Sequence, residues 1–259
     1  MKLMKRSNRS RRRLLARMLG AAGAATLAGC DRLSQTTWFP SLLGKADVLS
    51  EGAAALVGRK AMAQEFPASE RSPTFRSNGT SDPGTEDYEM LVSDGFAGYR
   101  LAIDGLVETP RIWTLDELRA MPSRSQITRH DCVEGWSAIG QWKGARLSSL
   151  LAAVRPKPAA RYAVFHCADP MSADGNDLYY ESIDLDDAYH EQTILAYELN
   201  GAPLPIKNGA PLRLRVERQL GYKHAKYVMR IEMVDSFVHI AGGHGGYWED
   251  QGYQWYAGI

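Results

Sequence analysis

The sequence predicts an α+β domain in which short strands outnumber short helices. Apolar or alternating runs typical of strands recur along the second half of the chain, and helical spacing is confined to brief segments. Turn-forming residues separate these runs. Hydrophobic residues make up 44% and charged residues 24% of the 259 residues, a composition typical of an ordinary globular protein. We therefore expect mixed sheets with few helices.

The elements follow in order from residue 99. The alternating or apolar patterns predict strands at residues 99–103, 126–131, 162–167, 212–216 and 227–234. Residues 114–117 have the pattern of a capping box, which begins a short helix. Apolar positions at helical spacing predict a second helix over 147–154, and Pro156 ends it. Residues 184–190 predict a helical turn.

Residues 1–30 have the layout of an export signal. They hold eight Lys or Arg side chains and no acidic one, and the arginines at 11–13 precede an apolar pair. A weakly hydrophobic run from 16 to 29 follows, too short and too rich in Ala and Gly for a good membrane span. This arrangement is typical of twin-arginine signals, which export proteins already folded, and a basic disordered tail is the alternative.

Residues 27–30, Leu-Ala-Gly-Cys, resemble the bacterial lipobox, in which the cysteine is lipidated. Asp31 follows directly, and in enterobacterial lipoproteins an Asp there resembles an inner-membrane retention signal. We expect a lipid anchor on Cys30 that holds the protein at the periplasmic face of the inner membrane. Residues 31–88, with four prolines and a Ser, Asn, Gly and Thr-rich stretch, predict a tether and an extended arm.

The charge of the chain is unevenly distributed. The formal net charge is +1, but residues 31–259 hold 23 basic and 30 acidic side chains, a net charge of about −7. A body of this sign gives no reason to expect a nucleic-acid partner.

Two cysteines remain after Cys30, namely Cys132 and Cys167. Because disulfides persist in the periplasm, a non-catalytic lipoprotein stapled by a Cys132–Cys167 disulfide is one interpretation. The chain has no C-x-x-C, H-E-x-x-H, G-x-S-x-G or phosphate-loop motif, so zinc, hydrolase and nucleotide sites lack their usual signatures.

The residues around Cys132 favour another interpretation. Residues 129–136, Arg-His-Asp-Cys-Val-Glu-Gly-Trp, and 141–147, Gln-Trp-Lys-Gly-Ala-Arg-Leu, resemble the molybdenum-binding segment of the sulfite oxidase family. In that family a cysteine at a strand end precedes a loop, and W-x-G-x-x-L opens a helix. The resemblance covers most of residues 76–235. The C-V-E-[AG]-W-S pattern is closer to the periplasmic methionine sulfoxide reductases and their short relatives within this family.

The resemblance implies a Mo-molybdopterin cofactor whose metal is bound by the thiolate of Cys132, a suitable soft ligand. It implies that Tyr179 lies beside the metal, although a packed strand aromatic is the alternative. Arg213 would bind the pterin phosphate through charge-assisted hydrogen bonds. Cys167 stands where the reductases have a Thr, and could equally be a core residue. The cofactor-binding residues implied are Asn78, Tyr88, Glu89, Cys167, Asn208, Arg213, Gly221, Tyr222 and Lys223.

The expected reaction is two-electron oxygen-atom transfer. Sulfite oxidases place an Arg just before the Asn that matches Asn78, whereas this chain has Ser77, so we expect sulfoxide reduction, with sulfite oxidation as the alternative. The sequence has no C-x-x-C-H heme motif, which implies a separate membrane-bound electron carrier, a cytochrome or a quinone-linked partner. Residues 89–259 should form one molybdopterin-binding domain of the sulfite oxidase type. Because few residues follow the last matched strand, we expect no C-terminal dimerisation domain and a monomer.

Overall fold

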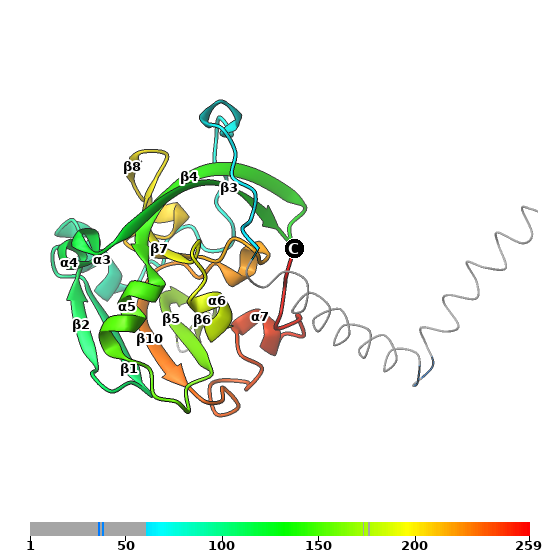
Figure 1. Cartoon of the computed structure of the whole chain (residues 1–259). Coiled ribbons are helices and arrows are strands. Elements are labelled where there is room, and N and C mark those ends of the chain that lie inside the picture. The colour runs from blue at the N-terminus through cyan, green and yellow to red at the C-terminus, as the bar shows by residue number, and fades with distance from the viewer. Residues whose placement is uncertain (1–35, 37, 39–60, 173, 176) are drawn as a thin grey trace, which may run out of the picture. The chain divides into compact units, whose positions relative to one another are not determined.

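The computed structural model describes Thr36, Trp38 and residues 61–172, 174–175 and 177–259 (Figure 1). The chain divides into two compact units, Met1–Val57 and Gly58–Ile259. The predicted export signal, the lipidation of Cys30 and the first half of the tether lie outside the described residues. In the described part, no helix has the length and apolar character needed to cross a membrane.

One sheet of the second unit carries the strand order β2-β1-β10-β5-β6. The strands are β1 (Arg100–Gly105), β2 (Arg111–Thr114), β5 (Tyr162–Pro170), β6 (Leu178–Asp184) and β10 (Val228–Val234). β1 pairs with β10 in parallel, and the other neighbours are antiparallel. The sheet is therefore mixed, as the sequence predicts.

The other sheet has the order β3-β4-β7-β8, with β9 also paired to β7. Its strands are β3 (Ser123–Cys132), β4 (Trp136–Arg146), β7 (Ile194–Leu199), β8 (Ala202–Pro203) and β9 (Arg213–Arg215). β3 and β4 form a long hairpin whose register runs from Ser123 opposite Ala145 to Cys132 opposite Trp136 (Figure 1). Cys132 is thus the last residue of a strand, directly before the hairpin turn.

The helices are short and cover the sheets. They are α3 (Glu86–Ser93), α4 (Leu115–Ala120), α5 (Leu147–Val154), α6 (Leu185–Ala188) and α7 (Tyr247–Asp250), with 3-10 turns at η1 (Ala68–Glu70), η2 (Ile206–Asn208) and η3 (Gly221–Lys223). The capping box of Thr114 and Glu117 is present, as predicted. The helix at 147–154 also forms, and Arg155 in the left-handed region ends it.

The main hydrophobic core joins the two sheets. It contains Leu150 of α5, Phe165 and Ile231 of the first sheet and Leu214 of the second, all fully buried. A smaller cluster packs Phe75 against Trp142 edge to face, with 5.0 Å between ring centroids. The described part of the predicted arm therefore packs on the domain, because Phe75 buries its ring there.

Gly144 allows the closest approach between β4 and β7. A Cβ atom built on it would lie 2.2 Å from the carbonyl oxygen of Leu195, and the register shifts at this point.

We expect Gly144→Ala to lower the free energy of unfolding by about 1–3 kcal/mol, because backbone must move to admit the methyl group. Chemical denaturation measures this change. Lys143→Ala, which removes a surface ion pair to Glu198 and a contact with the ring of Tyr197, should cost about 1 kcal/mol or less. Equal stabilities for the Gly144→Ala protein and the wild type would contradict this account.

Candidate active site

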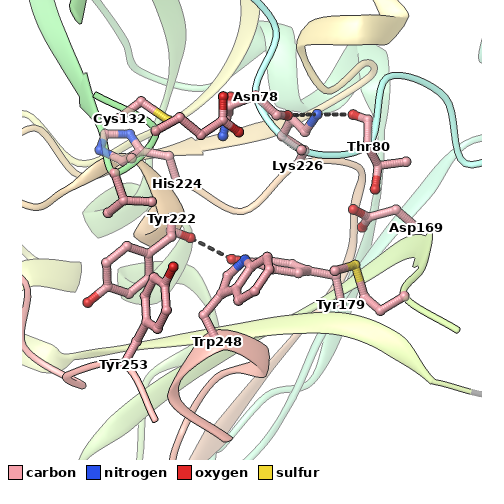
Figure 2. Close-up of a pocket in the computed structure, with 15 residues that line it drawn as sticks. Asn78, Thr80, Cys132, Asp169, Tyr179, Tyr222, His224, Lys226, Trp248 and Tyr253 are labelled. Atoms are coloured by element: carbon pink, nitrogen blue, oxygen red, sulfur yellow. Dashed lines mark hydrogen bonds between the residues drawn. The ribbon is translucent and has the colours of Figure 1, made fainter. Parts of the chain in front are cut away.

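A pocket of about 160 Å³ opens where chain segments from both sheets meet (Figure 2). Strand ends and loops line it, as is usual for sites built on a rigid scaffold. The residues that line it come from the arm, the end of β3, β5, β6, η3 with the loop after it, and the C-terminal segment. They include Asn78, Thr80, Cys132, Asp169, Tyr179, Gly221, Tyr222, His224, Lys226, Trp248 and Tyr253.

Cys132 lines the pocket at the end of β3 and is 9% exposed. Burial raises the pKa of its thiol, although the backbone N–H of Glu134 and the cation of Arg213 oppose that shift. Cys167 is buried in the main core, where its Sγ lies 3.9 Å from the carbonyl oxygen of Phe165. Both cysteines are free thiols. The disulfide of the alternative interpretation is therefore not formed.

Arg213 is a buried cation without a carboxylate ion pair among the described residues. It donates to the carbonyl oxygen of Asn208 at 3.1 Å and to Oδ1 of Asn78 at 3.0 Å, and its Nε has no partner. Burial and the neighbouring Arg215 lower the pKa of Arg213 to about 9. Arg215 differs, because Glu217 accepts two of its hydrogen bonds at 2.9 and 2.5 Å. Arg213 therefore retains hydrogen-bonding capacity for an anion.

Lys226 is a pocket residue that the sequence analysis did not single out. Its Nζ donates to the carbonyl oxygens of Asn78 at 2.7 Å and of Thr80, which brings the arm against the pocket (Figure 2). Burial and the charge of Arg213 lower its pKa to about 7. A second cation beside Arg213 would stabilise a bound dianion, which in turn favours the charged form of the lysine.

Two histidines lie behind and beside the pocket, with ring centroids 5.0 Å apart. His224 lines it, whereas Nδ1 of His130 accepts a hydrogen bond from Arg215, 2.9 Å away. Nδ1 of His224 and Nε2 of His130 are buried without a partner. Burial lowers the pKa of both well below the usual value, so both rings are neutral. A Cβ on Gly221 would lie 2.6 Å from Nε2 of His130, so η3 can approach only with glycine there.

Tyr179, which the resemblance places beside the metal, lines the pocket, and its hydroxyl is already hydrogen-bonded. It donates to the carbonyl oxygen of Tyr222 at 2.5 Å (Figure 2). Burial raises the pKa of this hydroxyl well above its usual value. In this arrangement the proton of Tyr179 is directed at the backbone of η3, and the side chain fixes the pocket wall.

Lys223 does not line the pocket. The resemblance predicts that it closes on the pterin phosphate, but its Nζ forms ion pairs with Glu181 at 2.5 Å and Glu249 at 2.6 Å. All three side chains are buried. A lysine with two carboxylate partners has little left to offer a phosphate, so Lys226 is the lysine that reaches the pocket.

Of the other implied cofactor residues, some line the pocket and some do not. Asn78, Gly221 and Tyr222 line it directly. Asn208 is buried, and its side-chain nitrogen is 3.5 Å from the carbonyl oxygen of Arg76. Tyr88 is buried and donates to the carbonyl oxygen of Ala210 at 2.7 Å, whereas its neighbour Glu89 is exposed.

The residues present fit a Mo-molybdopterin cofactor. A thiol at the pocket wall can supply a soft ligand to the metal. Arg213 with its unpartnered Nε and the cation of Lys226 can accommodate a phosphate. His224, which lines the pocket, has a buried nitrogen, Nδ1, without a partner. These buried polar atoms gain partners when a polar anionic group is bound.

Comparison with known proteins agrees with this fit. The family model of the oxidoreductase molybdopterin binding domain matches residues 90–239. A putative protein-methionine-sulfoxide reductase subunit from Azospira oryzae is 36% identical over 96% of this chain and 88% of its own length. Catalytic subunits of protein-methionine-sulfoxide reductase from Ralstonia nicotianae and Xanthomonas axonopodis are each 37% identical, over 53% and 55% of this chain. The matched parts span 44% and 47% of those two relatives, less than half of their length.

Among solved structures, the chain is similar to the sulfane dehydrogenase SoxCD from Paracoccus pantotrophus. The TM-score is 0.48, with 25% sequence identity over 54% of this chain and 39% of the other.

Proposed function

The chain belongs to the oxidoreductase molybdopterin-binding family, and we propose that it reduces sulfoxides by two-electron oxygen-atom transfer. The observation that carries this proposal is the thiol of Cys132 at a pocket that Lys226 also lines, with the buried cation Arg213 directly behind the lining residue Asn78. The names of the relatives support a sulfoxide as the substrate. When bound, the Mo-molybdopterin supplies the two-electron redox chemistry, and the protein positions it and tunes its surroundings.

We propose the following holders of the cofactor. Cys132 binds the metal, and Arg213 and Lys226 face the phosphate. The remaining contacts carried over from the family resemblance are Asn78, Tyr88, Glu89, Cys167 and Asn208, with the backbone of Gly221 and Tyr222. Lys226 takes the part that the sequence resemblance gave to Lys223.

Sulfite oxidation is the alternative reaction, and the residue before Asn78 argues against it. Ser77 donates to the carbonyl oxygen of Lys207 at 2.5 Å, so no cation stands at the position where sulfite oxidases place an Arg. A side-by-side assay of the purified protein, with reduced viologen plus sulfoxides and with sulfite plus an acceptor, tests the proposal. We expect turnover of sulfoxides. Turnover of sulfite alone would refute it.

Sulfoxide reduction also needs protons, because R₂S=O takes up two electrons and two protons and yields R₂S and water. Asp169 is a buried acid in the pocket, 3% exposed, and its Oδ1 has no partner. Burial raises the pKa of its carboxyl to about 6, although Lys226 opposes the shift. The other titratable groups that face Asp169 are Cys167, Tyr88, Tyr179 and Tyr227. We propose Asp169 as a proton donor to the departing oxygen.

The raised pKa of Asp169 fixes the direction of the pH dependence. The carboxyl holds its proton below pH 6 and loses it above, so kcat for sulfoxide reduction should fall as the pH rises through about 6. Asp169→Asn should lower kcat by about 100-fold and abolish the fall of kcat with rising pH. Asp87→Asn, on the exposed face of α3, is the control and should leave the profile unchanged. If kcat of Asp169→Asn still fell through about pH 6 as in the wild type, Asp169 would not be the proton donor.

For the whole chain we propose the organisation that the sequence predicts. Residues 1–30 direct export of the folded protein, Cys30 carries a lipid anchor at the periplasmic face of the inner membrane, and 89–259 form the catalytic domain. Electrons come from a membrane-bound cytochrome or quinone-linked carrier. Mass spectrometry of the N-terminus of the mature protein tests the anchor, and an unmodified Met1 would contradict it.

A further inference from the structure

The C-terminal segment, residues 242–259, lies entirely beyond residues 90–239, which match the family model, yet it forms one wall of the pocket. We propose that Trp248 and Tyr253 of this segment form a specificity wall that binds the apolar arm attached to the sulfoxide sulfur. The inference rests on the proposed function. It narrows the substrate class to sulfoxides with an extended apolar arm, such as a methionine sulfoxide side chain presented by a peptide.

The wall faces the polar side of the pocket. In Figure 2, Trp248, Tyr253 and Tyr222 lie on one side, and Asn78 and Lys226 lie on the other. The side proposed to hold the anionic cofactor is thus separated from a side lined by rings. A substrate between the two would direct its oxygen toward the cofactor side and its carbon groups toward the rings.

The rings form a connected aromatic surface. The centroids of Trp248 and Tyr253 are 5.4 Å apart, and Tyr253 meets Tyr222 edge to face at 5.2 Å. Aromatic rings make favourable contacts with sulfur and with the adjoining methyl and methylene groups. This surface suits a thioether-like arm better than a small anion such as sulfite, which would gain no charged partner from it.

The exposure of Tyr253 indicates a binding surface instead of core packing. Tyr253 is 42% exposed although it belongs to an aromatic cluster that could have been covered. The pocket therefore opens to solvent beside this ring, and an arm that belongs to a large molecule can enter from that side.

A buried ion pair anchors the wall to η3. Lys223 follows the pocket residues Gly221 and Tyr222 in η3 and binds Glu249 of α7, with both side chains at most 1% exposed. Such a pair resists separation, since either charge left alone would be buried without compensation. The hydroxyl of Tyr222 also donates to the carbonyl oxygen of Gln254 at 2.6 Å. These contacts hold the rings at a fixed position relative to the site.

Steady-state kinetics of the purified holoenzyme test the wall. The variants are Trp248→Ala and Tyr253→Ala, and the substrates are dimethyl sulfoxide and a short peptide that contains methionine sulfoxide. We expect KM for the peptide to rise about tenfold in each variant, the size of one lost aromatic contact. KM for dimethyl sulfoxide and kcat for both substrates should change less than about twofold. Tyr189→Ala is the matched control and should change nothing, because Tyr189 is 45% exposed at the C-cap of α6 and lies outside the pocket.

Trp248→Phe keeps a ring and should hold KM for the peptide within about threefold of the wild type. Tyr253 is 42% exposed, so Tyr253→Ala should fold even if Trp248→Ala does not. Molybdenum content and thermal denaturation show whether each variant is loaded and folded. A peptide KM equal to the wild type in Tyr253→Ala, or an equal rise of KM for both substrates, would show that the aromatic wall does not bind the substrate arm.

Calorimetric binding of the same peptide, without reductant, separates this inference from the proposed function. The wild type could bind the peptide about tenfold more tightly than Tyr253→Ala but fail to reduce it. The aromatic wall would then be confirmed as a binding surface, and the proposal of sulfoxide reduction would be wrong. If the wild type reduces the peptide and Tyr253→Ala binds it equally well, reduction stands and the wall is wrong.

Discussion

Cys132→Ser should lower kcat for sulfoxide reduction by more than about 100-fold while the protein remains folded. Residues that only orient a metal ligand already contribute about 10–100-fold, so removal of the ligand itself should cost more. The hydroxyl of serine is a harder and less acidic donor than a thiol, and does not replace a soft thiolate on the metal. The side chain is 9% exposed at the pocket wall, so the substitution disturbs little packing.

Steady-state kinetics, with circular dichroism as the check on folding, measure this effect. Cys132→Ala provides a second variant without any donor atom and should match Cys132→Ser. A Cys132→Ser protein that retains more than about one tenth of the wild-type kcat would show that the thiol is not needed for the reaction.

Arg213→Met should lower the amount of pterin retained after purification by more than about tenfold. A buried charge-assisted hydrogen bond contributes about 1.5–3 kcal/mol, and no carboxylate among the described residues forms an ion pair with Arg213. In the cofactor-free protein the same change should leave the melting temperature unchanged or raise it, because it removes a buried charge without an ionic partner. Pterin fluorescence after oxidation and calorimetry measure the two effects.

Arg215 offers a matched comparison for Arg213. It is equally buried, on the same strand two residues away, but Glu217 and His130 satisfy it. Arg215→Met should therefore lower the stability of the cofactor-free protein by about 3–5 kcal/mol, since Glu217 loses its cation. If Arg213→Met destabilised the cofactor-free protein as much as Arg215→Met, Arg213 would be a structural cation and not a phosphate ligand.

Local patterns predict the framework of this fold. The capping box of Thr114 and Glu117 and the helix at 147–154 depend on residues close in the chain, and both form. The strand that ends at Cys132 also forms, and the turn after it carries the thiol to the pocket. Gly144, part of the motif that carried the resemblance, has a physical reason to be glycine, because β7 approaches it too closely for a side chain.

The choice between two nearby lysines could not be predicted from local sequence. Lys223 and Lys226 are three residues apart, and the resemblance favoured Lys223. The outcome depends on Glu181 and Glu249, which are 42 and 26 residues from Lys223 in the chain and meet it only after folding. Lys226 instead meets carbonyl groups of the arm, 146 and 148 residues away. Tertiary contacts therefore determine which of the two lysine side chains reaches the pocket.

Asp169, His224 and the C-terminal aromatics could not be given a role from the sequence for the same reason. Each is an ordinary residue in its local sequence, and only the meeting of β5, η3 and α7 brings them to one pocket. An unpartnered buried atom, such as Oδ1 of Asp169 or Nδ1 of His224, is a property of the folded chain and has no sequence signature.

The central claim is that Cys132 binds molybdenum in a pterin cofactor. X-ray absorption at the molybdenum edge, on the wild type and on Cys132→Ser protein loaded with cofactor, tests it most directly. We expect molybdenum in the wild type at about one atom per chain, and one sulfur neighbour fewer around the metal in Cys132→Ser. An identical sulfur shell in the two proteins, or a wild type that holds pterin-bound molybdenum without any protein sulfur, would contradict the claim.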